Sequence, residues 1–333
     1  MGKTIAITGA TGFAGGHATT ELLKRGHRLV ALVRDPARAR LPGEVRVVKG
    51  DLEKAAAGDR EDAAAVAELV RGADAIVHLA GAIAVVRPRN FYSANAFATR
   101  ALAQAAADAG VRRFVHVSSL AAREQELSIY AVSKLLAEEV LKTFGGVLDS
   151  VALRAPVIYG PGDRGTLPLM RELTHGIAMI PGRRNARFSL IHAEDFARII
   201  ADAVTGGQTG IREVSDGTVG GYGWDDLLAV AGVAEGRTIR PVFLPKLIVA
   251  GAAVVAGGLS RMTGKASMVS RGKVNELYHP DWVSRGEDWP IADPITFKTG
   301  FPSTVAWYRH EGWLPPGRGT DRRRSNHIEE TKA

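Results

Sequence analysis

A tyrosine and a lysine stand four residues apart in the segment YAVSK, as Tyr130 and Lys134. Positions i and i+4 share one face of a helix, so the phenol and the ammonium would lie side by side. A nearby cation stabilises a phenolate, so we expect Lys134 to lower the pKa of Tyr130 and to fit it for proton transfer near neutral pH. The pattern is common, however, and a solvated helix face would show the same spacing. The surrounding elements must therefore decide between the two interpretations.

Two hydroxyl groups precede this pair by one loop. Residues 114–117 form an apolar run typical of a buried strand, and it leads directly into Ser118 and Ser119. Ligands of open α/β sheets bind at the carboxyl ends of the strands. A serine at the end of this strand could therefore lie beside the phenol of Tyr130.

The amino terminus supplies a place for a cofactor. The apolar run IAI at 5–7 indicates a buried strand, and the turn TGATGFAG at 8–15 leads from it into a helical pattern. Gly9 permits a sharp turn, Gly12 lets backbone N–H groups approach a pyrophosphate, and Gly15 lets the helix pack against the strand. The helix N-terminus adds a partial positive charge for the phosphate. We predict a dinucleotide site here rather than a plain strand-to-helix turn.

The first half of the chain alternates apolar strands with helices. We expect strands at 5–8, 28–33, 45–48, 75–79, 114–117 and 151–154, and helices at 17–25, 63–70, 95–109 and 131–142. Continuous apolar strands between helices indicate a parallel sheet covered on both faces. The expected fold class is therefore α/β, a Rossmann-type doubly wound parallel sheet.

The domain organisation follows from where this alternation ends. Residues 1–160 are expected to form the dinucleotide-binding domain, with 187–205 returning to it, and 53–62 to form a loop insertion. Residues 161–314 mix strands and helices irregularly and are expected to form a smaller substrate-binding region. The tail, 315–333, lacks core-forming residues and is expected to be disordered.

Composition and charge exclude several classes of function. The net charge of +8 suits an anionic ligand or surface, but the arginines are scattered and only 6% of residues are aromatic, which argues against nucleic-acid binding. The absence of cysteine excludes disulfides, thiolate catalysis and zinc–thiolate sites, and it fits a cytoplasmic protein. We expect no metal site, because His192 has no cluster of further ligands around it. We also expect no signal peptide, because the first residues already form a strand and a glycine turn.

An uncharged apolar segment lies within residues 246–261. Fourteen residues without charge are too few for an ordinary membrane span. Two interpretations remain open: a buried helix or pocket lid, and a helix that lies in a membrane surface.

Together these motifs resemble the extended short-chain dehydrogenase/reductase superfamily of NAD(P)-dependent epimerases, dehydratases and hydroxysteroid-type dehydrogenases. The resemblance covers residues 3–205 well and the rest more loosely. It rests on an ordered series of segments: TGATGFAG at 8–15, GDL at 50–52, HLAG at 78–81, YSAN at 92–95, VSS at 117–119, YAVSK at 130–134, LRAPVIYGPGD at 153–163 and IHAED at 191–195.

The resemblance implies hydride transfer between a nicotinamide and a carbonyl or alcohol, with four catalytic residues. Tyr130 would be the general acid and base, and Lys134 would hold the nicotinamide ribose hydroxyls. Ser119 would hydrogen-bond the substrate oxygen, with Ser118 as the alternative if the register shifts by one. Asn95 would relay protons through water to the lysine, unless it is simply a helix N-cap.

The resemblance also implies a cofactor-binding set along the sheet edge. Asp51 and Leu52 would border the adenine, although Asp51 could also be a turn residue. Leu79, Ala80 and Gly81 would line the middle of the cofactor, although the first two could be core residues. The full expected set is Thr8, Gly9, Thr11, Gly12, Phe13, Gly15, Arg34, Asp51, Leu52, Leu79, Ala80, Gly81, Val117, Tyr130, Lys134, Pro156 and Val157.

The choice of cofactor is determined at the end of the second strand. An acidic residue there would bind the ribose 2′-hydroxyl of NAD, whereas an arginine favours NADP. Val33 occupies the acidic position and Arg34 follows it, so we expect NADP(H). NAD(H) remains the alternative if Asp35 takes the ribose and Arg34 is only a loop charge.

Departures from the family pattern reduce the number of substrate classes to be expected. Dehydratases carry an Asp-Glu pair where this chain has Leu120 and Ala121, and sugar-nucleotide members often carry an arginine where Phe188 stands. The basic residues Arg183, Arg184 and Arg187 could still bind a phosphate or simply form a solvated loop.

The segment TVAWYRHEGWL at 304–314 resembles the tail of hydroxysteroid-dehydrogenase-like and hopanoid-associated members. We therefore expect a lipophilic, sterol- or hopanoid-like ketone or alcohol as the substrate, walled by the apolar segment near 246–261. The alternatives are a nucleotide-sugar epimerase and a non-catalytic NADP-binding subunit. The resemblance also implies a homodimer through the helices around Tyr130.

Overall fold

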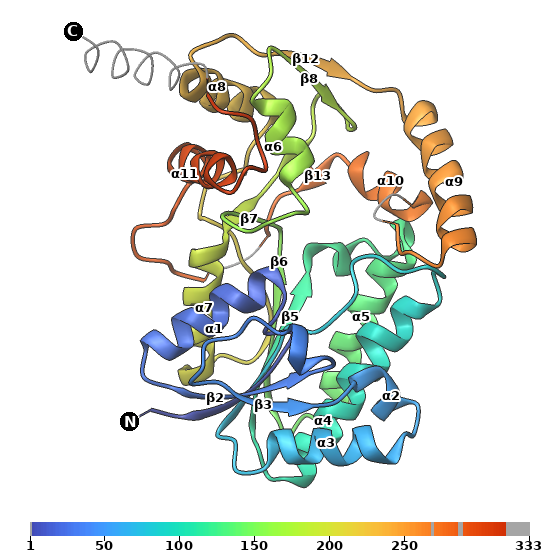
Figure 1. Ribbon diagram of the computed structural model, residues 1–333, viewed down its shortest axis with the longest axis vertical. Helices are drawn as coiled ribbons and strands as arrows, with labels where there is room; N and C mark the ends of the chain where they lie inside the picture. The colour runs from blue at the N-terminus through green and yellow to red at the C-terminus, as the bar shows by residue number, and fades with distance from the viewer. Residues whose placement is uncertain (1, 268–269, 286–288, 318–333) are drawn as a thin grey trace, which may run out of the picture.

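A computed structural model describes residues 2–267, 270–285 and 289–317 of the chain (Figure 1). Its centre is a seven-stranded sheet with the strand order β11-β6-β5-β4-β1-β2-β3, in which every neighbouring pair runs parallel. The expected Rossmann-type fold class is confirmed. The strands are β1 (Thr4–Thr8), β2 (Arg28–Val33), β3 (Arg46–Lys49), β4 (Ala75–His78), β5 (Arg113–Ser119), β6 (Asp149–Ala155) and β11 (Gly210–Glu213).

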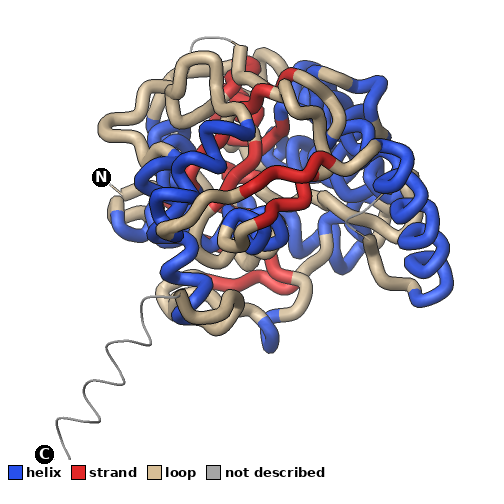
Figure 2. Tube along the Cα trace, turned by 90° about the horizontal axis from the view of Figure 1, so that it is seen from above, coloured by secondary structure: helices blue, strands red, loops and turns tan. Residues whose placement is uncertain are grey.

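Helices cover both faces of this sheet, so the strands run through the middle of the molecule (Figure 2). Side chains alternate along a strand, and in β1 Ile5 and Ile7 pack on one face while Ala6 packs on the other. The first face is covered by α1 (Phe13–Lys24) and α7 (Ala193–Thr205). The second is covered by α2 (Leu52–Ala56), α3 (Arg60–Val70), α4 (Ala98–Asp108) and α5 (Ile129–Thr143).

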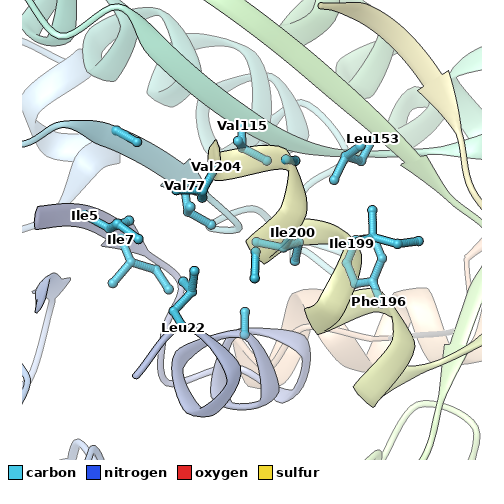
Figure 3. Packing of buried hydrophobic residues seen from close by; sticks show 14 of the residues in the cluster. Ile5, Ile7, Leu22, Val77, Val115, Leu153, Phe196, Ile199, Ile200 and Val204 are labelled. Atoms are coloured by element: carbon cyan, nitrogen blue, oxygen red, sulfur yellow. The ribbon is translucent and has the colours of Figure 1, made fainter. Parts of the chain in front are cut away.

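The core beneath α1 and α7 joins parts of the chain that are distant in sequence. Leu22 of α1 and Ile200 of α7 meet Val77 and Val115 of the sheet in one buried cluster (Figure 3). Residues 193–205 thus pack on the seven-stranded sheet, although they follow the first segments of the smaller region.

The expected loop insertion at 53–62 is wrong, because most of it is helical. Asp51 caps α2 by accepting hydrogen bonds from the backbone N–H groups of Glu53 and Lys54, at 2.8 and 3.4 Å. Asp59 caps α3 in the same way. Two aspartate caps beside a run of alanines favour helix over loop.

A smaller region packs beyond the carboxyl ends of the strands. Its core contains Tyr159, Phe297, Phe301 and Tyr308. Its helices are α6 (Leu167–Leu173), α8 (Trp224–Glu235) and α11 (Phe297–His310). Its paired strands are β7 (Val157–Tyr159) with β10 (Leu190–His192), β8 (Ile177–Ile180) with β12 (Arg240–Phe243), and β9 (Arg187–Phe188) with β13 (Asp281–Trp282).

Two helices complete the described chain, α9 (Lys246–Thr263) and α10 (Arg271–Leu277). They lie at one edge of the molecule, with α10 between α9 and the rest of the protein (Figure 1). Of the tail expected to be disordered, residues 318–333 lie outside the described residues.

The strand order reverses its direction at one point of the sheet edge. From β1 the chain runs outward through β2 and β3 on one side, and from β4 through β5 and β6 on the other. A crevice opens at such a reversal, outside the carboxyl ends of the strands. The glycine turn that follows β1 lies at this point.

Candidate active site

The glycine turn after β1 is a close-packed cradle that requires glycine. Gly9 has a φ of +76°, and a Cβ there would lie 2.6 Å from the backbone nitrogen of Ala80. A Cβ on Gly15 would lie 2.0 Å from the carbonyl oxygen of Gly9. Gly12 begins α1 with no side-chain cap and no acidic residue in the first turn. The free N–H groups at this helix terminus therefore fit an anionic pyrophosphate.

A buried histidine connects the glycine turn to the neighbouring strand. His78 Nδ1 lies 2.7 Å from Thr8 Oγ1, and His78 Nε2 lies 3.0 Å from Thr99 Oγ1. Burial, assisted by the nearby Lys134 cation, lowers the pKa of His78 to about 3, so the imidazole is neutral. Thr8 also accepts a hydrogen bond from Ala80 N. The Thr8 hydroxyl is thus turned into the protein, where it holds β1 and β4 together.

Tyr130, Lys134 and Ser119 meet at the carboxyl end of β5. The Tyr130 hydroxyl lies beside the side chain of Ser119, which opposes the effect of burial on the pKa of the phenol. Lys134 Nζ, one turn further along α5, donates a hydrogen bond to the carbonyl oxygen of Val117 at 2.7 Å. The ring of Phe91 contacts the Tyr130 ring edge-on, with 5.6 Å between centroids. A phenol and a hydroxyl thus lie together at the half-buried end of β5, and the lysine is held to the same strand two residues before Ser119.

The expected lowering of the Tyr130 pKa is wrong in this structure. Burial raises the pKa of Tyr130 to about 12, and this outweighs the opposing effect of Ser119, while the Glu276 carboxylate raises it further. Burial also lowers the pKa of Lys134 to about 8, against the pull of Glu138. The phenol is therefore protonated at neutral pH. A protonated phenol beside a substrate oxygen is a proton donor, as carbonyl reduction requires.

The neighbouring serine has a different partner. Ser118 donates a hydrogen bond to Glu138 Oε1 inside the protein. Arg154 binds the same carboxylate through two nitrogens, Nε at 2.9 Å and Nη2 at 2.7 Å. Of the two serines, Ser119 is therefore the one whose hydroxyl adjoins Tyr130, and the alternative register through Ser118 is wrong.

Arg154→Ala is expected to lower the free energy of unfolding by about 3–5 kcal/mol, because it leaves the fully buried Glu138 carboxylate without its cation. Urea denaturation measures the change. Arg112→Ala is the matched control, since Arg112 pairs with Asp149 on the surface and its removal should change stability little. Equal, small losses in both variants would show that the buried pair does not hold β6 against α5.

Asn95 holds the loop that borders the crevice. It lies in a π-helical turn, η2 (Tyr92–Phe97), and not at a helix N-cap. Its Oδ1 accepts from Ala82 N at 2.9 Å, and its Nδ2 donates to Ala82 O at 3.2 Å and to Ser133 Oγ at 2.8 Å. A Cβ on Gly81 would lie 2.7 Å from Asn95 Oδ1. The amide therefore fixes the loop after β4 against α5, next to Lys134. Its expected part in proton relay stays a prediction.

Of the residues expected at the adenosine end of the cofactor, two have side chains engaged within the protein and one is exposed. Asp51 uses its carboxylate to cap α2, and the side chain of Leu52 is largely buried in the core. Arg34 is exposed, and its cation opposes the rise in the pKa of Glu53 that burial and Asp51 cause. Arg34 therefore lies at the same corner as the N-terminus of α2.

The remaining members of the expected cofactor set line the same edge with differing exposure. Leu79 and Ala80 are half-buried and pack on opposite core clusters. Phe13 packs edge-on against His17. Thr11 and Val157 are exposed, and Val117 and Pro156 are half-buried.

Sequence reasoning missed two groups at the site. Phe91 covers the Tyr130 ring, and Glu276 of α10 places a carboxylate near the phenol. Neither lies in a recognisable motif, and Glu276 comes from a helix that is distant in sequence, so no local pattern reveals them.

Comparisons with known proteins show the family to which the chain belongs. The NAD dependent epimerase/dehydratase family matches residues 5–213. A protein of Caulobacter vibrioides named ceramide reductase is 36% identical over 93% of this chain and 96% of its own length. Sterol demethylase protein B of Methylococcus capsulatus is 24% identical over 93% of this chain and all of its own.

Solved structures share the fold. The enzyme WbmH of Bordetella bronchiseptica, in complex with NAD⁺, superposes with a TM-score of 0.66 at 21% identity, covering 93% of this chain and 99% of its own. A putative epimerase from Burkholderia cenocepacia superposes with a TM-score of 0.70 at 19% identity, covering 93% and 98%. The chain belongs to the NAD dependent epimerase/dehydratase family, within the extended short-chain dehydrogenase/reductase superfamily.

Proposed function

We propose that this protein is an NADP(H)-dependent reductase that converts a keto group on a long-chain, ceramide-like lipid to an alcohol. The observation that carries the proposal is the meeting of Tyr130, Ser119 and Lys134 beside the glycine cradle. The phenol lies beside Ser119, and burial raises its pKa to about 12, so that it holds its proton at neutral pH.

The residues divide the work of the reduction. When bound, the nicotinamide cofactor supplies a hydride to the carbonyl carbon. The Tyr130 hydroxyl gives its proton to the carbonyl oxygen, so that one hydride and one proton together make the alcohol. Ser119 hydrogen-bonds that oxygen as negative charge develops on it. Lys134, one helical turn from Tyr130, would hold the nicotinamide ribose.

A lipid substrate is favoured over a nucleotide sugar for two reasons. The ceramide reductase and the sterol demethylase protein B that resemble this chain are both named for lipids. Arg187, which stands next to the expected diphosphate-binding position, is bound to Asp226 and to the carbonyl oxygens of Gly220 and Gly221. Its guanidinium is thus engaged within the protein. The first reason shifts our expectation from a sterol- or hopanoid-like compound toward a long-chain lipid.

A substrate assay tests the proposal. The protein is incubated with NADPH and, separately, an oxo-ceramide, an oxosteroid and UDP-glucose. We expect stoichiometric oxidation of NADPH and formation of a hydroxy-lipid with the oxo-ceramide. An epimerised sugar nucleotide without net oxidation of the cofactor would establish the rival epimerase activity and overturn the reductase.

Arg34→Ala is expected to weaken NADPH binding about tenfold or more, and NADH binding little, because the guanidinium pairs with the 2′-phosphate that only NADPH carries. Arg46→Ala is the matched control, since Arg46 lies at the amino end of β3, whereas Arg34 follows the carboxyl end of the neighbouring β2, and Arg46 pairs with Glu68. Fluorescence titration of the unmodified protein and both variants gives the dissociation constants for NADPH and NADH. Equal weakening of both cofactors by Arg34→Ala would show that Arg34 does not read the phosphate.

A further inference from the structure

Helix α9 presents a broad apolar surface to solvent. Among the described residues, α9 is the one helix that is both long enough and apolar enough to cross a membrane. Only 11% of its residues are buried. Leu247 and Met262 near its two ends are 86% and 87% exposed. Ile248, Val254, Val255 and Leu259 are also more than half exposed. So large an exposed apolar patch on a folded protein marks an interaction site.

The opposite side of α9 is held by the protein. Ala253 and Ser260 are buried, and Val249 packs against a cluster that contains Val274 and Tyr278. The inward positions follow the helical spacing of three and four residues, so one stripe of α9 faces α10 and the rest faces outward. A helix attached along its length in this way is supported on one side and uncovered on the other.

The charge of the residues around α9 favours one kind of partner for its outward side. From Gly236 to Asn275 the chain contains no acidic residue, and it contains seven basic ones: Arg237, Arg240, Lys246, Arg261, Lys265, Arg271 and Lys273. Lys246 and Arg261 bracket the apolar stretch of α9, and Lys265 follows it; all three are exposed. Apolar side chains flanked by cations complement a bilayer surface that carries anionic lipid headgroups.

We propose that α9 docks this protein onto the surface of an anionic lipid bilayer, lying in the plane of the interface. An orientation in which α9 spans the bilayer fits the structure less well. The 18 residues of α9 reach about 27 Å at about 1.5 Å per residue, less than the roughly 30 Å of the hydrocarbon core. Crossing would also strip the inward stripe of α9 from α10.

The docked helix is connected to the catalytic helix. Through α10, Gly272 packs against Ser128, which donates a hydrogen bond to Glu276. Ser128 in turn caps the start of α5 by accepting from Ala131 N at 2.9 Å. Docking through α9 therefore brings the Tyr130 end of α5 toward the lipid surface, where a lipid substrate could enter.

Vesicle co-sedimentation of the full-length protein tests the docking, with no substrate or cofactor present. We expect binding to vesicles of phosphatidylcholine mixed with phosphatidylglycerol, and much weaker binding to phosphatidylcholine alone. Added salt should weaken the binding, because it screens the attraction between the basic residues and the headgroups. Equal binding to both vesicle types would overturn the role of charge, and no binding to either would overturn the docking.

Two variants test whether the membrane-binding surface lies on α9. The double variant Val255→Gln, Leu259→Gln is expected to weaken binding to the anionic vesicles about tenfold or more, because both side chains leave the lipid. Val233→Gln on α8 is the matched control, since Val233 is also exposed and lies outside α9. Equal effects of the two changes would overturn the assignment to α9.

Two further outcomes would overturn peripheral docking of α9 on a bilayer surface. A dimer in solution that the double variant dissociates would show that a second copy of the chain covers α9. Protein that stays with the membrane in alkaline carbonate would show a spanning helix. Because the assay measures vesicle binding alone, a failed docking leaves the proposed reductase activity standing, and a failed reductase assay leaves the docking standing.

Discussion

Tyr130→Phe is expected to reduce turnover of the lipid ketone by about 10²–10⁴-fold while leaving the affinity for NADPH unchanged. The change removes the hydroxyl that gives its proton to the carbonyl oxygen, and it keeps the ring that packs against Phe91. Steady-state rates and a fluorescence titration of NADPH measure the two quantities separately.

Tyr308→Phe is the matched control, since its hydroxyl donates to Asp163 O at 2.6 Å within the core of the smaller region. This variant should lose some stability and keep its turnover number. If Tyr130→Phe instead kept the turnover of the unmodified protein, Tyr130 would have no part in proton transfer.

Gly15→Ala is expected to weaken NADPH binding about ten- to hundredfold, because its Cβ would lie 2.0 Å from Gly9 O and must push α1 away from the turn. Gly16→Ala changes the next residue of the same helix, where a Cβ would meet nothing within 4 Å. That variant should bind NADPH normally and be slightly more stable, because alanine favours helix over glycine. Calorimetric titration of both proteins measures the difference, and equal loss of affinity in both would contradict the proposed cradle.

The sequence predicts the elements whose signals are local. The run from β1 through the glycine turn to α1 is recognisable because only glycine tolerates the positive φ at Gly9 and the close approach at Gly15. The placing of Tyr130 and Lys134 on one helix face follows from their spacing. The carboxyl end of β5 brings Ser119 to the same place, because parallel strands all end at one edge.

Features that depend on distant contacts could not be predicted in this way. The high pKa of Tyr130 results first from burial, which the spacing to Lys134 does not reveal. Ser118 and Ser119 are adjacent and chemically identical, and only the tertiary contact of Ser118 with Glu138 separates their roles. The sequence predicts a loop where α2 lies, because a helix of five residues is too short to show a helical periodicity.

A crystal structure of the protein with NADPH bound would test the proposed chemistry of the site. We expect the pyrophosphate at the N-terminus of α1, Lys134 Nζ within hydrogen-bond distance of the nicotinamide ribose, and the Tyr130 hydroxyl facing the hydride-bearing carbon of the ring. A nicotinamide bound away from Tyr130, or a cofactor bound away from the glycine turn, would contradict the proposed chemistry.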